Sequence, residues 1–181
     1  MSEPAATADA ERVPFLQEKR MLVTATIVLV ADQITKLIVS NSLDPEQEII
    51  IIQGFLKFVN WHNTGAAWSQ FQGKSLQLAV ISVIALGALI HWRHHFEIHT
   101  RTGKIAMGML IGGILGNFID RLAYQHVVDF IRFFLIDRDG NQHGYPAFNI
   151  ADMGICIGVG LLFVMAWRHP DEMEEGDNKE P

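Results

Sequence analysis

Two apolar segments with polar ends decide the fold: one ends in GGILGNFIDR (residues 112–121), and the next begins with FNIAD (residues 148–152). The short run VVDF (residues 127–130) lies between them. Asp, Asn and Arg are costly to keep at the edge of membrane-length apolar segments, so such residues are candidates for function. This stretch therefore predicts a membrane fold with a polar site at one end.

Four apolar segments occur in the 181-residue chain, at about residues 21–40, 75–92, 104–122 and 147–167. Each is close to the length that spans about 30 Å of hydrocarbon, and the last two carry small residues that let helices approach closely. The first follows Lys19-Arg20 as a signal peptide would, but no small-residue cleavage site follows it. We therefore expect four retained transmembrane helices in a mainly α membrane protein, and four such segments in one small chain disfavour buried soluble helices.

Basic residues set the expected orientation of these helices. If the helices alternate in direction, one side of the membrane receives Lys19, Arg20, Arg93, Arg101, Lys104 and Arg168, and the other receives Lys57, Lys74, Arg132 and Arg138. The positive-inside rule makes the first side cytoplasmic, so both termini are expected there. The polar N-terminal residues 1–18 and the acidic residues 170–181 are expected to be disordered, which leaves residues 19–169 as one membrane domain.

The two connections on the outer side are expected to form a small β-sheet. Residues 48–61 are rich in Ile, Phe, Val and Trp and are interrupted at Gln53-Gly54, which predicts a β-hairpin. Residues 130–136, followed by Asp139-Gly140 and Tyr145, predict a second short extended or hairpin element.

Alternating helices would also bring the polar residues of the apolar segments to the same outer face. These residues are Asp32, Lys36, Asn117, Asp120, Arg121, Asn149 and Asp152, and Asp129 lies in an outer connection. Most have a purely structural alternative. Asp32 and Lys36 are i,i+4 neighbours that could pair on one helix face. Asn149 could cap a helix that has Asp152 in its first turn, and Asp120 and Arg121 could extend to the membrane–water interface. Asp129 has no such alternative, because it lies in an apolar run beside no obvious cation.

Most other chemistries are disfavoured by the sequence. There is no serine-nucleophile motif, no His-Glu-x-x-His element and no phosphate-binding glycine loop, and the outer histidines His62, His126 and His143 are scattered. We therefore expect no metal and no cofactor, and the absence of a basic run argues against a nucleic-acid partner. Paired carboxylates remain. Two aspartates brought close at low dielectric hold one proton between them, so one can activate a water while the other polarises an amide carbonyl.

Five collinear motifs carry a resemblance to a known family between about residues 23 and 162. They are Asp32-Gln33-x-Thr35-Lys36, Asn63-x-Gly65-Ala66-Ala67, Gly112-Gly113-x-x-Gly116-Asn117-x-x-Asp120-Arg121, Val127-Val128-Asp129-Phe130 and Phe148-Asn149-x-Ala151-Asp152. Together they resemble the bacterial lipoprotein signal peptidase, or signal peptidase II, family of integral-membrane aspartic peptidases.

This resemblance implies specific roles and ligands. It implies a catalytic pair, Asp129 and Asp152, and supporting residues Asp32, Lys36, Asn63, Gly65, Asn117, Asp120, Arg121 and Asn149. It implies a multi-pass protein of the bacterial inner membrane, with a small extracytoplasmic sheet and a short outer helix or loop over the site. The implied substrates are prolipoproteins cut before a diacylglyceryl-modified cysteine, and the implied ligands include membrane lipid and inhibitors of the globomycin type.

The chain departs from the family pattern at three positions. Gln125 stands where glycine is frequent, Trp68 where phenylalanine is usual, and Met153 where a small hydroxyl residue is common. Two other functional classes stay open from the residues alone, a small transporter or proton relay and a membrane scaffold. The first needs polar residues at several depths, whereas the inner halves of the apolar segments are almost purely apolar, and the second leaves Asp129 unexplained.

Overall fold

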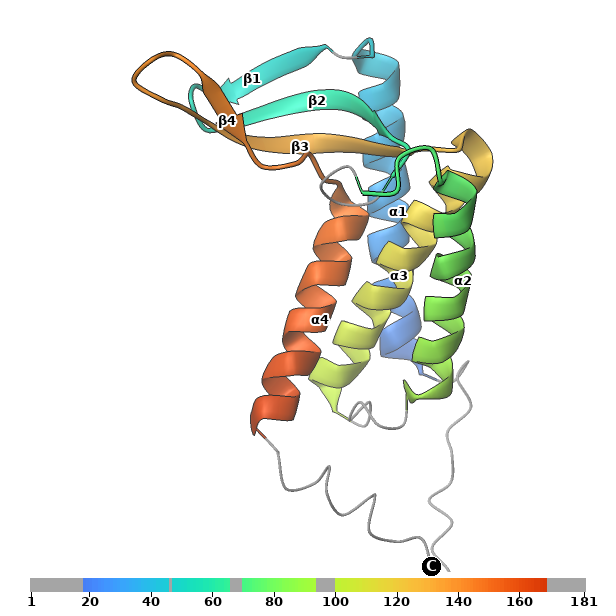
Figure 1. Ribbon diagram of the computed structural model, residues 1–181. Helices are drawn as coiled ribbons and strands as arrows, with labels where there is room; N and C mark the ends of the chain where they lie inside the picture. The colour runs from blue at the N-terminus through green and yellow to red at the C-terminus, as the bar shows by residue number, and fades with distance from the viewer. Residues whose placement is uncertain (1–17, 46, 66–69, 94–99, 169–181) are drawn as a thin grey trace, which may run out of the picture.

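The structure is a computed structural model that describes residues 18–45, 47–65, 70–93 and 100–168. These residues form four helices and four strands, in the order α1 (Lys19–Ser42), β1 (Glu48–Ile52), β2 (Leu56–Asn63), α2 (Ser75–His91), α3 (Arg101–Tyr124), β3 (Val127–Ile136), β4 (Gln142–Gly144) and α4 (Ile150–Arg168). The helices lie side by side with alternating direction, and the sheet crosses one end of the bundle (Figure 1).

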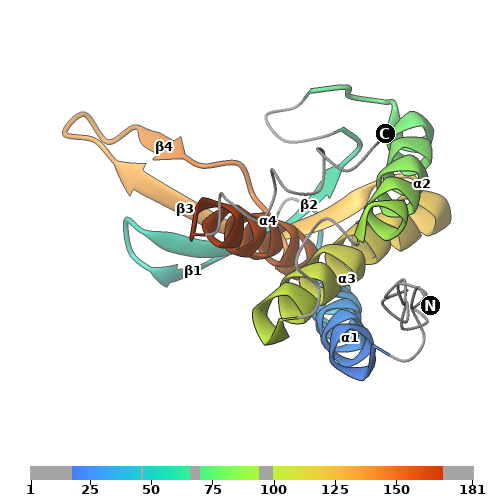
Figure 2. The same cartoon turned by 90° about the horizontal axis from the view of Figure 1, so that it is seen from below.

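Helix α3 lies at the centre of the bundle and packs against the other three helices (Figure 2). Glycines make this arrangement possible. A Cβ atom added to Gly112 would lie 2.5 Å from the carbonyl oxygen of Ala25 in α1, and one added to Gly113 would overlap the carbonyl oxygen of Ala151 in α4. The backbones of α1 and α4 therefore approach α3 more closely than any side chain would allow, as the small residues in the sequence predicted.

The outward faces of the helices are apolar. Large apolar side chains exposed there include Ile27, Ile34 and Ile38 of α1, Leu76, Ile81 and Ile84 of α2, and Val159, Phe163 and Trp167 of α4. Helices α1, α3 and α4 are long and apolar enough to cross a membrane, whereas α2 is apolar but has only 17 residues. Three of the four predicted spans thus meet the length requirement.

The four strands form one antiparallel sheet in the order β1-β2-β3-β4. The predicted first hairpin is confirmed and turns at Gly54, whose φ of 71° suits glycine, and the second outer element, predicted as extended or hairpin, is the hairpin of β3 and β4. Lys57, which the sequence analysis counted among the outer basic residues, is only 1% exposed. Its Nζ donates to Glu48 of β1 at 2.5 Å and to Gln142 of β4 at 3.0 Å, so it links both edges of the sheet.

The sheet is joined to the start of α4 by backbone hydrogen bonds. The amide of Phe148 donates to the carbonyl of Ile131 at 3.0 Å, and the amides of Phe130 and Ile131 donate to the carbonyl of Phe148 at 3.0 and 2.9 Å. These bonds keep Phe148 extended beside β3, so α4 begins at Ile150 and not at the predicted residue 147. They also place the polar start of α4 next to Asp129.

Several sequence predictions fall at or beyond the edges of the described residues. Residues 1–17 and 170–181, expected to be disordered, lie outside them, as does Trp68. Glu18, also assigned to the disordered extension, is instead buried and pairs with Lys104 at 2.7 Å. The predicted outer helix or loop was given no bounds, and in the connection between β2 and α2 residues 66–69 lie outside the described part while residues 70–73 form turns.

Candidate active site

Asp129 lies on β3 at the junction of sheet and bundle and is 4% exposed. Its two carboxylate oxygens each accept one amide hydrogen bond, from Asn63 Nδ2 at 2.9 Å and from Asn149 Nδ2 at 2.8 Å. Burial, and after it the nearby charge of Asp152, raise the pKa of this carboxyl from its ordinary value to about 7, against the smaller lowering effects of Asn63, Lys36 and Asn149. Asp129 therefore holds a proton up to neutral pH.

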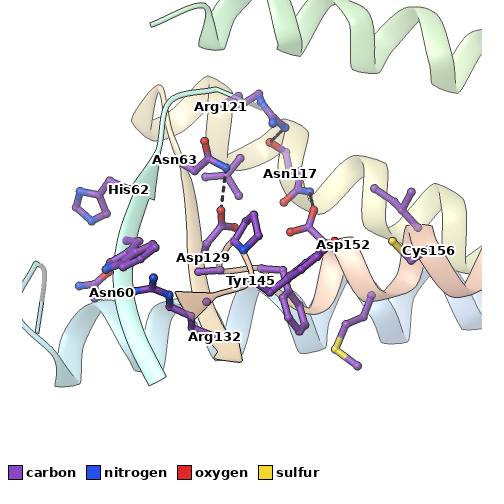
Figure 3. Close-up of a pocket in the computed structure, with 18 of the residues that line it drawn as sticks. Asn60, His62, Asn63, Asn117, Arg121, Asp129, Arg132, Tyr145, Asp152 and Cys156 are labelled. Atoms are coloured by element: carbon purple, nitrogen blue, oxygen red, sulfur yellow. Dashed lines mark hydrogen bonds between the residues drawn. The ribbon is translucent and has the colours of Figure 1, made fainter. Parts of the chain in front are cut away.

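Asp152 lies in the first turn of α4 and points toward the same region (Figure 3). Its Oδ1 accepts a hydrogen bond of 2.7 Å from Asn117 Nδ2 of α3. Asp152 and Asn149 also exchange two bonds: the Asp152 amide donates to Asn149 Oδ1 at 2.9 Å, and the Asn149 amide donates to Asp152 Oδ2 at 3.2 Å. This reciprocal pair is a capping box.

Asn149 therefore serves both as a cap and as a bridge. It caps α4, which the sequence analysis gave as its purely structural alternative. Its Nδ2 also donates to Asp129 and lies 3.2 Å from Asn117 Oδ1. The side chain is fully buried. Asn149 thus connects the two aspartates that the sequence analysis paired, because its side-chain amide donates to Asp129 and its backbone amide to Asp152.

Behind the aspartates, Lys36 of α1 holds a buried ionic cluster. Its Nζ lies 2.7 Å from Asp32, 2.8 Å from Asp120 and 3.0 Å from Asn117 Oδ1. The two carboxylates in turn accept backbone amides: Asp32 accepts that of Ala151 at 2.9 Å, and Asp120 accepts that of Val128 at 3.3 Å. The cluster therefore fixes the residues immediately before Asp152 and Asp129.

Arg121 and Gly65 connect α3 to the segment that follows β2. Arg121 Nη2 donates to the Gly65 carbonyl and Nη1 to the Asn117 carbonyl, both at 3.3 Å. The Gly65 amide donates to Asn63 Oδ1 at 2.9 Å, which orients the amide that contacts Asp129. A Cβ atom at Gly65 would overlap the carbonyl oxygen of Gln70, so this turn requires glycine.

A cavity of about 1100 Å³ opens onto both aspartates. Its lining includes Asn63, Asn117 and Arg121 near the aspartates, Trp61, His62, Arg132 and Tyr145 on the sheet side, and Met153, Ile155 and Cys156 along α4. Asp32, Lys36, Asp120 and Asn149 lie behind this wall. In the part of the chain that the structure describes, no three His, Cys, Asp or Glu side chains are placed to hold a metal ion.

All ten residues singled out in the sequence thus lie in one connected polar region. Sequence reasoning missed several others. Gln33 donates to Asp120 Oδ1 at 2.9 Å. This residue is part of the first of the five motifs, but the sequence analysis gave it no role. Trp61 and Arg132 line the cavity, and the sequence carried no signal for this, because it depends on the pairing of Trp61 with Asp129 across β2 and β3.

The positions that depart from the family pattern also find a structural setting. Gln125, where glycine is frequent, adopts the left-handed conformation with φ of 60° at the end of α3, which explains why glycine suits the position. Met153 is 39% exposed and lines the cavity.

Comparison with known proteins identifies the family. Residues 24–168 match the family model described as signal peptidase (SPase) II. The chain belongs to the signal peptidase II family. A lipoprotein signal peptidase of Bacillus velezensis is 36% identical over 140 residues, which cover 77% of this chain and 88% of that protein. One from Listeria monocytogenes serotype 4a is 37% identical over 137 residues, covering 76% and 86%.

Solved structures of this fold are also similar. One bacterial membrane enzyme matches this signal peptidase II family member with a TM-score of 0.74 and 30% identity, covering 90% of this chain and 93% of that one. A second matches with a TM-score of 0.69 and 32% identity, covering 81% and 92%. With its three membrane-length helices, the chain is therefore a membrane protein of the peptidase family that its motifs resembled. The interpretations as a transporter or as a scaffold are wrong.

Proposed function

We propose that this protein is a membrane aspartic endopeptidase that removes the signal peptide from diacylglyceryl-modified prolipoproteins by cutting before the modified cysteine. Asp129 and Asp152 are the catalytic pair. The observation that carries the proposal is that both carboxylates border one cavity and both accept hydrogen bonds from Asn149, Asp129 from its side chain and Asp152 from its backbone amide. The names of the relatives, lipoprotein signal peptidases, support the substrate class.

The proposed mechanism follows from the shared proton. The pKa of Asp129, raised to about 7, keeps one proton on the pair near neutral pH. The ionised carboxylate removes a proton from a water molecule, which attacks the scissile carbonyl, while the protonated carboxyl donates to the carbonyl oxygen. The pair then gives a proton to the departing amine. The amides of Asn63 and Asn117, each bonded to one carboxylate, hold the two groups in orientation.

The cavity suits a peptide that carries a lipid. Its α4 side includes Met153, Ile155 and Cys156, which continue into the apolar outer face of the helix and can accept acyl chains. Its sheet side, with Trp61 and Tyr145, offers a wall for extended peptide. We propose that membrane lipid contacts the α4 side and that inhibitors of the globomycin type occupy the same cavity.

The proposed setting is the bacterial inner membrane, with residues 19–169 as the peptidase domain. We propose that all four helices cross it, since 17 residues of α2 extend about 26 Å at a rise of about 1.5 Å per residue. Both termini then lie in the cytoplasm, and the sheet and the aspartates lie on the extracytoplasmic side. The distribution of basic residues supports this orientation.

Single-turnover cleavage of a diacylglyceryl precursor tests the reaction. Asp129→Asn and Asp152→Asn each keep the side-chain shape but cannot carry the catalytic proton, so each is expected to abolish cleavage in a folded protein. Asp139→Asn, in the exposed turn between β3 and β4, is the matched control and should cleave at the wild-type rate. Substantial cleavage by either variant of the pair, or loss of wild-type cleavage with a chelator, would contradict the aspartic mechanism.

A further inference from the structure

Arg132 of β3 is a cavity residue that the proposed mechanism does not use. Its guanidinium lies over the Trp61 ring, with Cζ 4.3 Å from the ring centre. It forms no ion pair with any residue the structure describes, and its Nε is buried without a hydrogen-bond partner there. A planar cation stacked on an aromatic ring keeps its N–H edges free for an acceptor.

Gly144 of β4 provides the space for this arrangement. A Cβ atom at this position would lie 2.8 Å from Arg132 Nε and 3.0 Å from Nη2. The backbone of Gly144 does not have a positive φ, so an alanine is compatible with the strand and would displace only the end of the arginine side chain.

The other charges along this wall already have partners. Glu48 lines the cavity, but its carboxylate is paired with Lys57 at 2.5 Å. Arg121 lies near the aspartates and donates to two backbone carbonyls, although its Nε, like that of Arg132, is buried without a hydrogen-bond partner among the described residues. The sheet end of the cavity therefore presents one cation that needs an anionic acceptor.

The position of Arg132 indicates which part of a substrate reaches it. Arg132 lies three positions after Asp129 on β3, a rise of about 10 Å along the backbone, which an extended peptide also covers in about three residues. The apolar signal peptide belongs on the membrane side, so the chain that follows the modified cysteine is the part that lies along the sheet.

We propose that Arg132 is a specificity-determining residue that binds an acidic side chain of the precursor about three residues after the modified cysteine. This inference rests on the proposed function. A guanidinium binds a carboxylate through two parallel N–H···O bonds, and its contact with the Trp61 ring holds the end of the Arg132 side chain at the cavity wall. A lipid phosphate is a second acceptor of the same geometry, but Arg132 borders the cavity that the cleaved peptide must enter.

Paired precursors test the proposal by single-turnover kcat/KM. One carries Asp about three residues after the cysteine, with variants at the two neighbouring positions, and its partner carries Asn. The wild type should prefer the acidic precursor by about five- to tenfold, the gain of one charge-assisted pair at a partly exposed site. Arg132→Gln should reduce the preference to about one, Arg132→Lys should retain part of it, and Gly144→Ala should weaken it without changing the charge. Arg138→Gln, an exposed arginine outside the cavity, should keep the wild-type preference.

The failures are distinguishable. Equal preference in the wild type and Arg132→Gln, or an unchanged preference in Gly144→Ala, would overturn this inference while leaving the peptidase function intact. A loss of rate in Arg132→Gln on both precursors, seen in vesicles containing phosphatidylglycerol but not in neutral detergent, would assign the guanidinium to a lipid phosphate and also overturn it. A wild type that cleaves neither precursor would overturn the proposed function as well.

Discussion

Asn149 combines two roles that can be separated by substitution. Its Oδ1 caps α4, and its Nδ2 bonds Asp129. Serine can cap a helix but is too short to bridge to Asp129, whereas alanine can do neither. We expect Asn149→Ser and Asn149→Ala to lose cleavage to a similar degree, while Asn149→Ala is less stable by about 1 kcal/mol. Equal unfolding free energies of the two variants would show that the cap contributes nothing here.

The raised pKa of Asp129 predicts how cleavage depends on pH. Because the pKa lies at about 7, the pair loses its shared proton as the pH rises above that value, and the single-turnover rate should fall there. A rate that rises steadily from pH 6 to pH 9 would contradict the shared-proton mechanism.

Stability should follow the same titration with a definite sign. A carboxyl whose pKa is higher in the folded protein binds its proton more tightly when folded. Its contribution to the free energy of unfolding is therefore complete below about pH 4 and is lost as the pH rises through about 7. Asp129→Asn removes this group. The unfolding free energy of the wild type should therefore fall relative to that of Asp129→Asn between these two pH values, as measured by denaturation in detergent.

The backbone of Gln125 is strained, and glycine at this position would relieve the strain. Its φ of 60° is costly for a residue with a Cβ atom, and it ends α3 immediately before the strand that carries Asp129. Gln125→Gly should raise the unfolding free energy by about 0.5–1 kcal/mol, while Gln125→Ala, which keeps the Cβ atom, should not. A melting temperature of Gln125→Gly at or below that of Gln125→Ala would refute the strain.

At the level of the secondary-structure elements, Lys36 joins α1 to the starts of β3 and α4. Its two carboxylate partners, Asp32 and Asp120, are 0% and 2% exposed. Lys36→Met would leave both charges buried without a cation, so we expect a loss of roughly 3–5 kcal/mol in unfolding free energy together with cleavage.

Lys57 provides the matched control for this prediction. It is as deeply buried as Lys36, but the side chain of its partner Glu48 is 42% exposed. After Lys57→Met the Glu48 carboxylate can turn to water, so the loss should be clearly smaller than for Lys36→Met. Equal losses would show that buried charge is not what makes the Lys36 cluster important.

For the molecule as a whole, the sequence predicted the elements better than their contacts. The apolar segments predicted the helices, and the interruption at Gln53-Gly54 predicted the first hairpin. The burial of Lys57, the bonds between Phe148 and β3, and the stacking of Arg132 on Trp61 were not predictable. Each depends on the register between segments distant in sequence, which local patterns do not specify.

The same holds for the site. Eight of the ten site residues were found by residue type, and alternating helices predicted that these eight share one face, whereas Asn63 and Gly65 came from the family resemblance alone. The individual contacts were not predictable. Asp32 and Asp120 accept hydrogen bonds from the backbone amides of Ala151 and Val128, and because almost every residue has a backbone amide, the residue type does not indicate which one is bound. The sequence motifs therefore identified the residues of the site, whereas the contacts between them are known only from the structure.

The arrangement of the four helices leads to a last prediction, on membrane topology. The start of α1, the end of α2, the start of α3 and the end of α4 lie at the end of the bundle away from the sheet (Figure 1). The pair between Glu18 and Lys104 joins two of these ends directly. If all four helices cross the membrane, reporters after Arg93 and after Trp167 should lie in the cytoplasm, and one inserted at Gly140 should lie outside.

The reporter after Arg93 is the informative one, because α2 is the shortest helix and its 17 residues extend less far than α1, α3 or α4. Should α2 fail to cross while α1 does, this reporter would lie outside together with a reporter after Leu43, and α3 could not then run from the cytoplasm to the aspartates. A reporter after Leu43, at the sheet end of α1, is the control, since one crossing already places it outside. Gly140 and Trp167 reporters on the same side would contradict the crossing of α4 and, with it, the extracytoplasmic active site.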